Sequence, residues 1–245
     1  MADIFTRRDD HGSLASGRRR TWFRTWQERV RDPSLTALLI LEVCVLFLAA
    51  PLAAKGLPVA RAIGEVLILA VVIVVVVLSY RRGAILVILI GLAARLASFS
   101  LGPGWSSIAA SVLNHGGNIL VFLAVSWVVA RAVYAPGRIT FHRLQGTVVL
   151  YLNLASIFAS VFSLIWVLDP AAFGNLAAPT GGPSEMVTML YFSLTTMTTT
   201  GYGDIVPVDP FARSLANLES MFGQFYFAIT VTRLVTLELE EHRRR

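Results

Sequence analysis

The sequence predicts an all-α membrane protein with six transmembrane helices and a shorter re-entrant helix between the fifth and sixth. Composition is the first observation behind this prediction. Of 245 residues, 56% are hydrophobic and 15% are charged, and mean hydropathy is +0.68, whereas soluble domains carry about 25% charged residues. This composition excludes disorder and argues against a soluble enzyme. The lone cysteine, Cys44, excludes an intrachain disulfide framework.

Apolar stretches of transmembrane length are the second observation. A helix needs about 20 residues to cross a hydrocarbon core of about 30 Å. The third predicted span is short and the fourth is long, so their ends are the least defined. The six predicted spans are Leu35–Ala54, Ala62–Tyr80, Gly83–Ser100, Ile108–Val133, Leu144–Leu168 and Ser214–Leu237.

The distribution of basic residues predicts the orientation, because Lys and Arg are enriched in cytoplasmic loops. The first 32 residues contain eight arginines. The loops expected on the same side carry Arg81, Arg82, Arg131, Arg138 and Arg143, and the chain ends on Arg243, Arg244 and Arg245. The alternate loops carry only Lys55, Arg61 and Arg213. We therefore expect a multi-pass protein of the cell (plasma or inner) membrane, with both termini cytoplasmic and residues 169–213 outside.

The N-terminal segment, residues 1–32, lacks the features of a secretory signal. Trp22, Phe23, Trp26 and Val30 fall on one helical face. This pattern predicts either a short interfacial helix or a basic, partly disordered tail.

The outward segment contains a helix of its own. Ser184–Met197 is moderately apolar and too short to span the membrane, so we expect it to be re-entrant. Ser184 can cap its start, and Glu185 suits the positive end of the helix dipole.

The string Thr198–Asp204 directly follows this helix. Gly201 and Gly203 alternate with larger residues, and glycine adopts positive φ at little steric cost. Alternating handedness turns successive carbonyls to one side of an extended strand. There, carbonyl oxygens can replace the hydration shell of a cation. The dipole of the preceding helix places partial negative charge at the same point.

This region, residues 144–237, resembles the pore domain of the potassium channel family, in which a filter motif Thr-Val-Gly-Tyr-Gly is followed by Asp. The resemblance implies a homotetramer, since each chain has one pore loop and four are needed to enclose an axis. It implies that the chain is not an enzyme, has no cofactor and conducts potassium as its permeant ion. The implied filter is Thr199, Thr200, Gly201, Tyr202 and Gly203, with potassium at the carbonyls of the first four and at the Thr199 hydroxyl.

The resemblance also implies which residues support the filter. Tyr202 is expected to point away from the axis, and Asp204 to lie behind the outer mouth. Thr200 replaces the usual Val or Ile and changes the packing there. Thr195 stands where some family members have a Glu that pairs with the filter Asp, so we expect Tyr191 to donate to Asp204 instead.

Two residues of the sixth span are candidates for a functional role. Gly223 lies 19 residues beyond Asp204, where the family has a gating hinge; the alternative is close helix packing. Glu219 lies one turn earlier, and an ionisable residue in the bilayer suggests a function. A structural hydrogen bond to the pore helix is the alternative.

Residues 33–134 resemble a voltage-sensor bundle only by count and position. Glu65 and Arg95 lie at similar depth and are predicted to pair. Glu42 has no obvious partner. His115 and Asn118 suggest a hydrated crevice, or helix packing through the neighbouring Gly116 and Gly117. Residues 108–130 contain no Lys or Arg, so we expect weak voltage dependence.

The sequence as a whole predicts a potassium-selective channel subunit with lipid as its surroundings and no nucleic-acid partner. A linker (135–143) and a short cytoplasmic tail (238–245) complete the predicted domains. The alternatives are a non-selective cation channel, a secondary transporter and a non-conducting scaffold. The intact Gly-Tyr-Gly disfavours the first, and the lack of a second broken helix disfavours the transporter.

Overall fold

A computed structural model of the chain describes residues 34–78, 82–100, 107–134, 141–179 and 183–244. The predicted interfacial helix and most of the predicted linker 135–143 lie outside these residues. In the described part, the chain is all-α apart from two residue pairs that form a small antiparallel ladder. The all-α prediction is therefore confirmed.

A helix occupies each predicted span. The first helix is Ser34–Ala54, which includes a π-helical segment η1 (Val45–Ala49) and α2 (Ala50–Ala54). The remaining helices are α3 (Pro58–Leu78), α4 (Arg82–Ser100), α5 (Ser107–Val133), α6 (Phe141–Leu168), η2 (Pro170–Ala172), α7 (Pro183–Met197) and α8 (Pro210–Arg244). Strands β1 (Phe173–Gly174) and β2 (Val206–Pro207) form the ladder.

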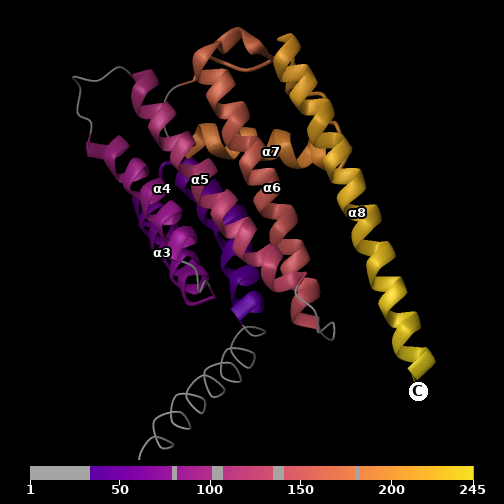
Figure 1. The fold of residues 1–245 in the computed structure, drawn as a ribbon. Helices are drawn as coiled ribbons and strands as arrows, with labels where there is room; N and C mark the ends of the chain where they lie inside the picture. Colours follow the sequence, from indigo (N-terminus) through magenta and orange to yellow (C-terminus); the bar gives the residue numbers. More distant parts are fainter. Residues whose placement is uncertain (1–33, 79–81, 101–106, 135–140, 180–182, 245) are drawn as a thin grey trace, which may run out of the picture.

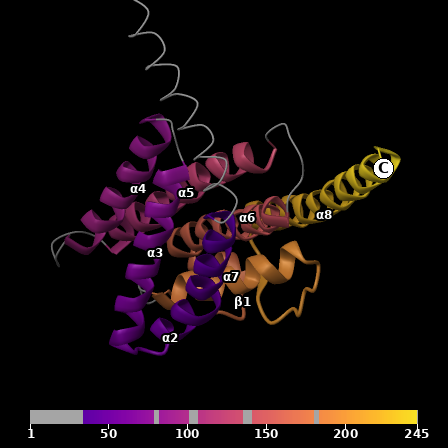
Figure 2. The same ribbon diagram turned by 90° about the horizontal axis from the view of Figure 1, so that it is seen from below.

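The helices are arranged around a central pair. Helices α3 and α4 lie at one side of the molecule and α8 at the other, and α5 and α6 lie side by side between them (Figure 1). The short α7 runs across α6 rather than along it, as a re-entrant helix does. Seen from below, the C-terminal part of α8 extends away from the other helices (Figure 2).

Three helices of the described chain are long and apolar enough to cross a membrane, by length and composition: Ser34–Ala54, Ile108–Val133 and Phe141–Leu168. Shorter apolar stretches occur at Val66–Val75 and Gly83–Ser98. The chain is thus a multi-pass membrane protein. That six helices cross the membrane stays a prediction.

A π-helical turn interrupts the first helix directly before Pro51. The N–H of Ala50 bonds to the carbonyl of Val45, five residues back. Proline has no N–H to donate and its ring crowds the preceding turn, so a wider turn relieves the clash without ending the helix. The helix then continues to Ala54.

Two glycines allow α4 and α5 to pack closely. A Cβ on Gly117 would lie 2.6 Å from the carbonyl oxygen of Gly91, and one on Gly91 would lie 2.7 Å from that of Gly117. Small residues allow such backbone contact between membrane helices. The sequence predicts that Gly116 shares this role, but a Cβ there would meet no atom of the described residues within 4 Å.

The central helix of the fold is α6. Ser156, Ser160 and Ser163 are fully buried on it, and each hydroxyl donates to the carbonyl four residues earlier at 2.9 Å. Because each hydroxyl is paired within the helix, the three small serine side chains can pack against neighbouring helices without leaving a buried polar group unpaired.

An aromatic cluster fixes α7 to α6. Phe192 of α7 contacts Phe162 of α6 edge to face, with ring centroids 5.0 Å apart. Phe173 of β1 contacts both rings, at 5.9 and 5.5 Å. All three side chains are buried. This cluster positions α7 against α6.

A second core cluster crosses the predicted border between the N-terminal bundle and the pore region. It joins Leu38 of the first helix and Val129 of α5 to Val149 of α6. The division into separate domains therefore stays a prediction.

Candidate functional site

The candidate site is the string Thr198–Asp204, which begins where α7 ends at Met197. The last carbonyls of α7 accept from the first backbone N–H groups of the string. Thr198 N donates to the Leu194 carbonyl at 3.0 Å, and Thr200 N donates to the Thr195 carbonyl at 2.8 Å. The string thus leaves the helix by a tight, hydrogen-bonded turn.

The backbone of the string alternates in handedness. φ is +58° at Thr199, +54° at Gly201 and +78° at Gly203, while Thr200 and Tyr202 are not in the positive region. This alternation is the pattern expected of a strand whose successive carbonyls face one side. Positive φ costs glycine little, whereas for the β-branched Thr199 it is an unusual conformation that its surroundings must hold.

The β1–β2 ladder fixes the far end of the string. Gly174 pairs with Val206, and Phe173 with Pro207. Val208 N also donates to the Ala172 carbonyl at 2.8 Å. The segment that enters the loop is therefore joined to the segment that leaves it.

The start of α8 is set by Asp209. Its carboxylate accepts from the backbone N–H of Phe211 at 2.8 Å and of Ala212 at 3.0 Å. These are helix-start N–H groups that lack partners within the helix, and the negative charge suits the helix dipole.

Threonine hydroxyl groups link the string to α7. Thr198 Oγ1 donates to the Leu194 carbonyl at 2.7 Å, which leaves Thr200 Oγ1 to donate to Thr198 Oγ1 at 2.8 Å. The Thr200 hydroxyl, the departure from the usual Val or Ile, thus has a partner. Thr195 Oγ1 donates within α7, to the Phe192 carbonyl at 2.9 Å.

Tyr191 of α7 lies beside the outer part of the string. Its ring stacks on that of Tyr202, with centroids 6.2 Å apart and an angle of 3° between the rings. Its hydroxyl faces the Asp204 carboxylate. The role of Tyr191 as a support of the filter stays a prediction.

Close contacts join α8 to α7 below the string. A Cβ at Gly223 would overlap the carbonyl oxygen of Met197, and α8 is continuous through this position. Ser193 Oγ hydrogen-bonds to Glu219 Oε1, and Glu219 is fully buried. These contacts are of the packing and hydrogen-bonding kinds that the sequence offered as alternatives, and the hinge role of Gly223 stays a prediction.

The predicted pair of Glu65 and Arg95 is not described, because the Glu65 side chain lies outside the described part of the structure. The aliphatic part of Arg95 lies near Gly117 of α5. Glu42 is buried, and its two carboxylate oxygens have no hydrogen-bond partner among the described residues. Asn118 is buried in α5.

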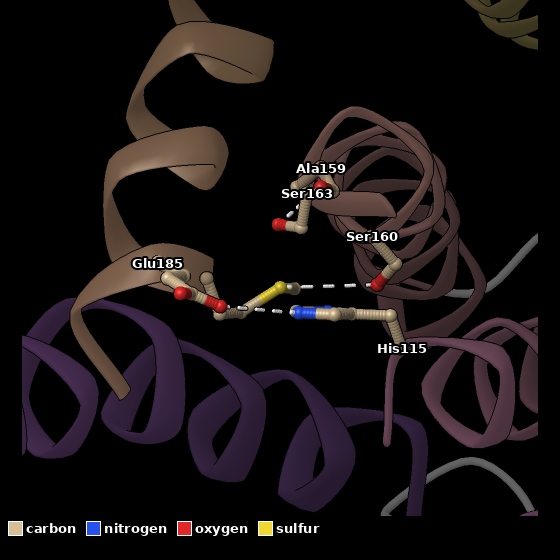
Figure 3. A network of polar contacts seen from close by, with 6 residues as sticks. His115, Ala159, Ser160, Ser163 and Glu185 are labelled. Carbon is tan, nitrogen blue, oxygen red and sulfur yellow. Dashed lines mark hydrogen bonds and ion pairs between the residues drawn. The ribbon is translucent and has the colours of Figure 1, made fainter. Parts of the chain in front are cut away.

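His115 has a partner that sequence reasoning missed. Its Nε2 lies 3.7 Å from Oε2 of Glu185 at the start of α7, and both side chains are buried (Figure 3). The sequence indicates for Glu185 only an acid at a helix start. The two residues are 70 positions apart, so no local pattern could have paired them.

Gln224 is the second residue that sequence reasoning missed. Its Nε2 donates to Oγ1 of Thr199 at 3.2 Å. The rule that drew attention to Glu219, a polar residue inside an apolar span, applies equally to Gln224 and could have found it.

Comparison with known proteins identifies the class. Residues 146–239 match the family described as ion channel. This region is therefore an ion channel pore domain, which belongs to a family of channels and not of enzymes. The resemblance proposed from the sequence is confirmed to this extent.

One curated relative carries potassium in its name. The chain is 34% identical over 79 residues to the potassium voltage-gated channel protein shk-1 of Caenorhabditis elegans. That match covers 31% of this chain and 15% of the nematode protein. No solved structure matches the chain significantly.

Proposed function

We propose that the chain is one subunit of a homotetrameric channel that conducts potassium passively and selectively. The observation that carries the proposal is the alternating backbone at Thr199, Gly201 and Gly203 within a matched ion channel domain. Carbonyls of Thr199, Thr200, Gly201 and Tyr202, with the Thr199 hydroxyl, then replace the hydration shell of the ion. Gly203 completes the filter at its outer end.

The tetramer follows from the number of pore loops. One chain supplies one strand, and rings of carbonyls around an axis need several. Large apolar side chains on α8, such as Phe222, Phe225 and Phe227, are exposed on the single chain, and neighbouring subunits would cover part of this face. In this assembly all six long helices cross the membrane, with both termini cytoplasmic.

Flux into liposomes tests the function. Purified protein is reconstituted in vesicles, and uptake of rubidium or potassium is compared with uptake of sodium. We expect strong preference for potassium and rubidium. Equal sodium uptake would indicate a non-selective cation channel, and no uptake at all would indicate a non-conducting scaffold.

Two further measurements complete the test. Uptake that requires a second ion or a proton gradient would indicate a secondary transporter instead of a passive pore. Native mass measurement in mild detergent is expected to give four chains, and a conducting monomer or dimer would contradict the assembly.

A further inference from the structure

The Gln224 side chain reaches the inner end of the filter string from α8. Its Nε2 lies 3.2 Å from Oγ1 of Thr199. We propose that Gln224 is a positioning residue for the innermost potassium site, acting through the Thr199 hydroxyl. This inference rests on the proposed function, because it assigns a role to a residue beside that same site.

The hydrogen bonds of Thr199 determine which group of Gln224 faces it. The Thr199 hydroxyl donates its one proton to the Thr198 carbonyl at 2.7 Å. It can therefore only accept from Gln224, so the amide presents NH₂ and not its oxygen. A hydroxyl oxygen has two lone pairs. One accepts from Gln224, and the other is left to bind a cation.

Contacts of α8 with α7 bring Gln224 within reach. The preceding residue, Gly223, lets the α8 backbone approach the Met197 carbonyl. The Met197 carbonyl accepts a hydrogen bond from Tyr151 Oη of the central helix, α6, at 3.3 Å. One turn earlier, Glu219 bonds to Ser193 of α7. Gln224 is thus fixed to a part of α8 that is packed against the end of the pore helix.

Thr199 needs such support. Its φ of +58° is an uncommon conformation for a β-branched residue. Such a conformation persists when neighbouring groups hold it. The bond to the Thr198 carbonyl holds Oγ1 from within the string, and the bond from Gln224 holds the same oxygen from α8. Loss of Gln224 would free the hydroxyl to turn its lone pair away from the ion.

The first test is Gln224→Met, which keeps an unbranched side chain of similar length but has no donor. The readout is the potassium concentration that gives half-maximal protection of the purified protein against thermal unfolding, in a buffer of a large organic cation. We expect this midpoint to rise about fivefold, the value of one side-chain hydrogen bond. Melting without potassium is expected to change little.

Two controls test whether Gln224 acts through the Thr199 hydroxyl. Thr232→Val removes a hydroxyl on the same helix that donates to the Ala228 carbonyl, and we expect the wild-type midpoint. In a Thr199→Val background, Gln224→Met is expected to have no further effect. In a Thr199→Ser background, which keeps the hydroxyl, it is expected to keep its full effect.

An unchanged midpoint in Gln224→Met would overturn the inference. An equal effect of Gln224→Met on the potassium midpoint with and without the Thr199 hydroxyl would also overturn it. A lower melting temperature without potassium, with no change of the potassium midpoint, would do the same. Both results indicate a general structural role. If the wild-type protein neither binds nor conducts potassium, the proposed function itself fails. If the wild-type protein conducts potassium normally and Gln224→Met has the wild-type potassium midpoint, only this inference is overturned.

Discussion

His115 in α5 and Glu185 at the start of α7 lie 3.7 Å apart, Nε2 to Oε2, and both are buried. The contact joins the N-terminal helices to α7, which directly precedes the string Thr198–Asp204. Neighbouring hydroxyls of α6 bond elsewhere. Ser163 donates to the carbonyl of Ala159 (Figure 3). Ser160 donates to the carbonyl of Ser156 and lies near the sulfur of Met186.

The first prediction concerns this contact. His115→Ala and Glu185→Ala are each expected to destabilise the protein, and together by less than the sum of the two. Residues in contact show coupling of about 0.5–3 kcal/mol in a double-mutant cycle. Unfolding in mild detergent measures it. The control cycle pairs His115→Ala with Ser163→Ala and should be additive. Additivity between His115 and Glu185 would contradict the contact.

The second prediction compares adjacent glycines of α5. Gly117→Ala is expected to destabilise the protein, since its Cβ would lie 2.6 Å from the Gly91 backbone oxygen. Gly116→Ala is the matched control, because its Cβ would meet nothing within 4 Å. Alanine favours a helix over glycine by up to about 1 kcal/mol, so this change should be neutral or stabilising. Equal melting temperatures for the two variants would show that α4 and α5 do not pack as described.

The third prediction concerns positive φ in the filter. Gly201→Ala is expected to abolish potassium flux, because a Cβ opposes its φ of +54°. Gly56, with φ of +82° and open space for a Cβ, lies outside the pore region. Gly56→Ala therefore introduces comparable local strain, and should lower stability while leaving flux unchanged. Wild-type flux in Gly201→Ala would remove Gly201 from the ion pathway.

The fourth prediction concerns voltage. Steep gating needs about 3–4 charges in each subunit, each contributing about 2.3 kcal/mol per 100 mV. The basic residue in the last turn of α5 is Arg131, whose guanidinium lies 5.6 Å from the centre of the Trp127 ring. We expect a shallow conductance–voltage curve in planar bilayers with symmetrical potassium. A sigmoid equivalent to about ten charges per tetramer would contradict this expectation.

The sequence by itself determined the features that depend on local chemistry. Apolar length predicted where helices occur, and the short apolar segment at 184–197 predicted α7 within one residue of its start. The glycine spacing predicted positive φ at Gly201 and Gly203. These features follow from burial of side chains and from steric limits on the backbone, both of which act on neighbouring residues.

Only the tertiary structure decided which distant residues meet. It paired His115 with Glu185, gave the Thr199 hydroxyl a partner in Gln224, and placed Gly117 and not Gly116 against Gly91. Each depends on how two helices are rotated and how closely they approach. In helices that are apolar on most faces, hydrophobicity alone does not fix that rotation, because many faces would bury equally well. Backbone contact at single glycines and a few buried polar bonds fix it instead, and they exist only once the helices are packed.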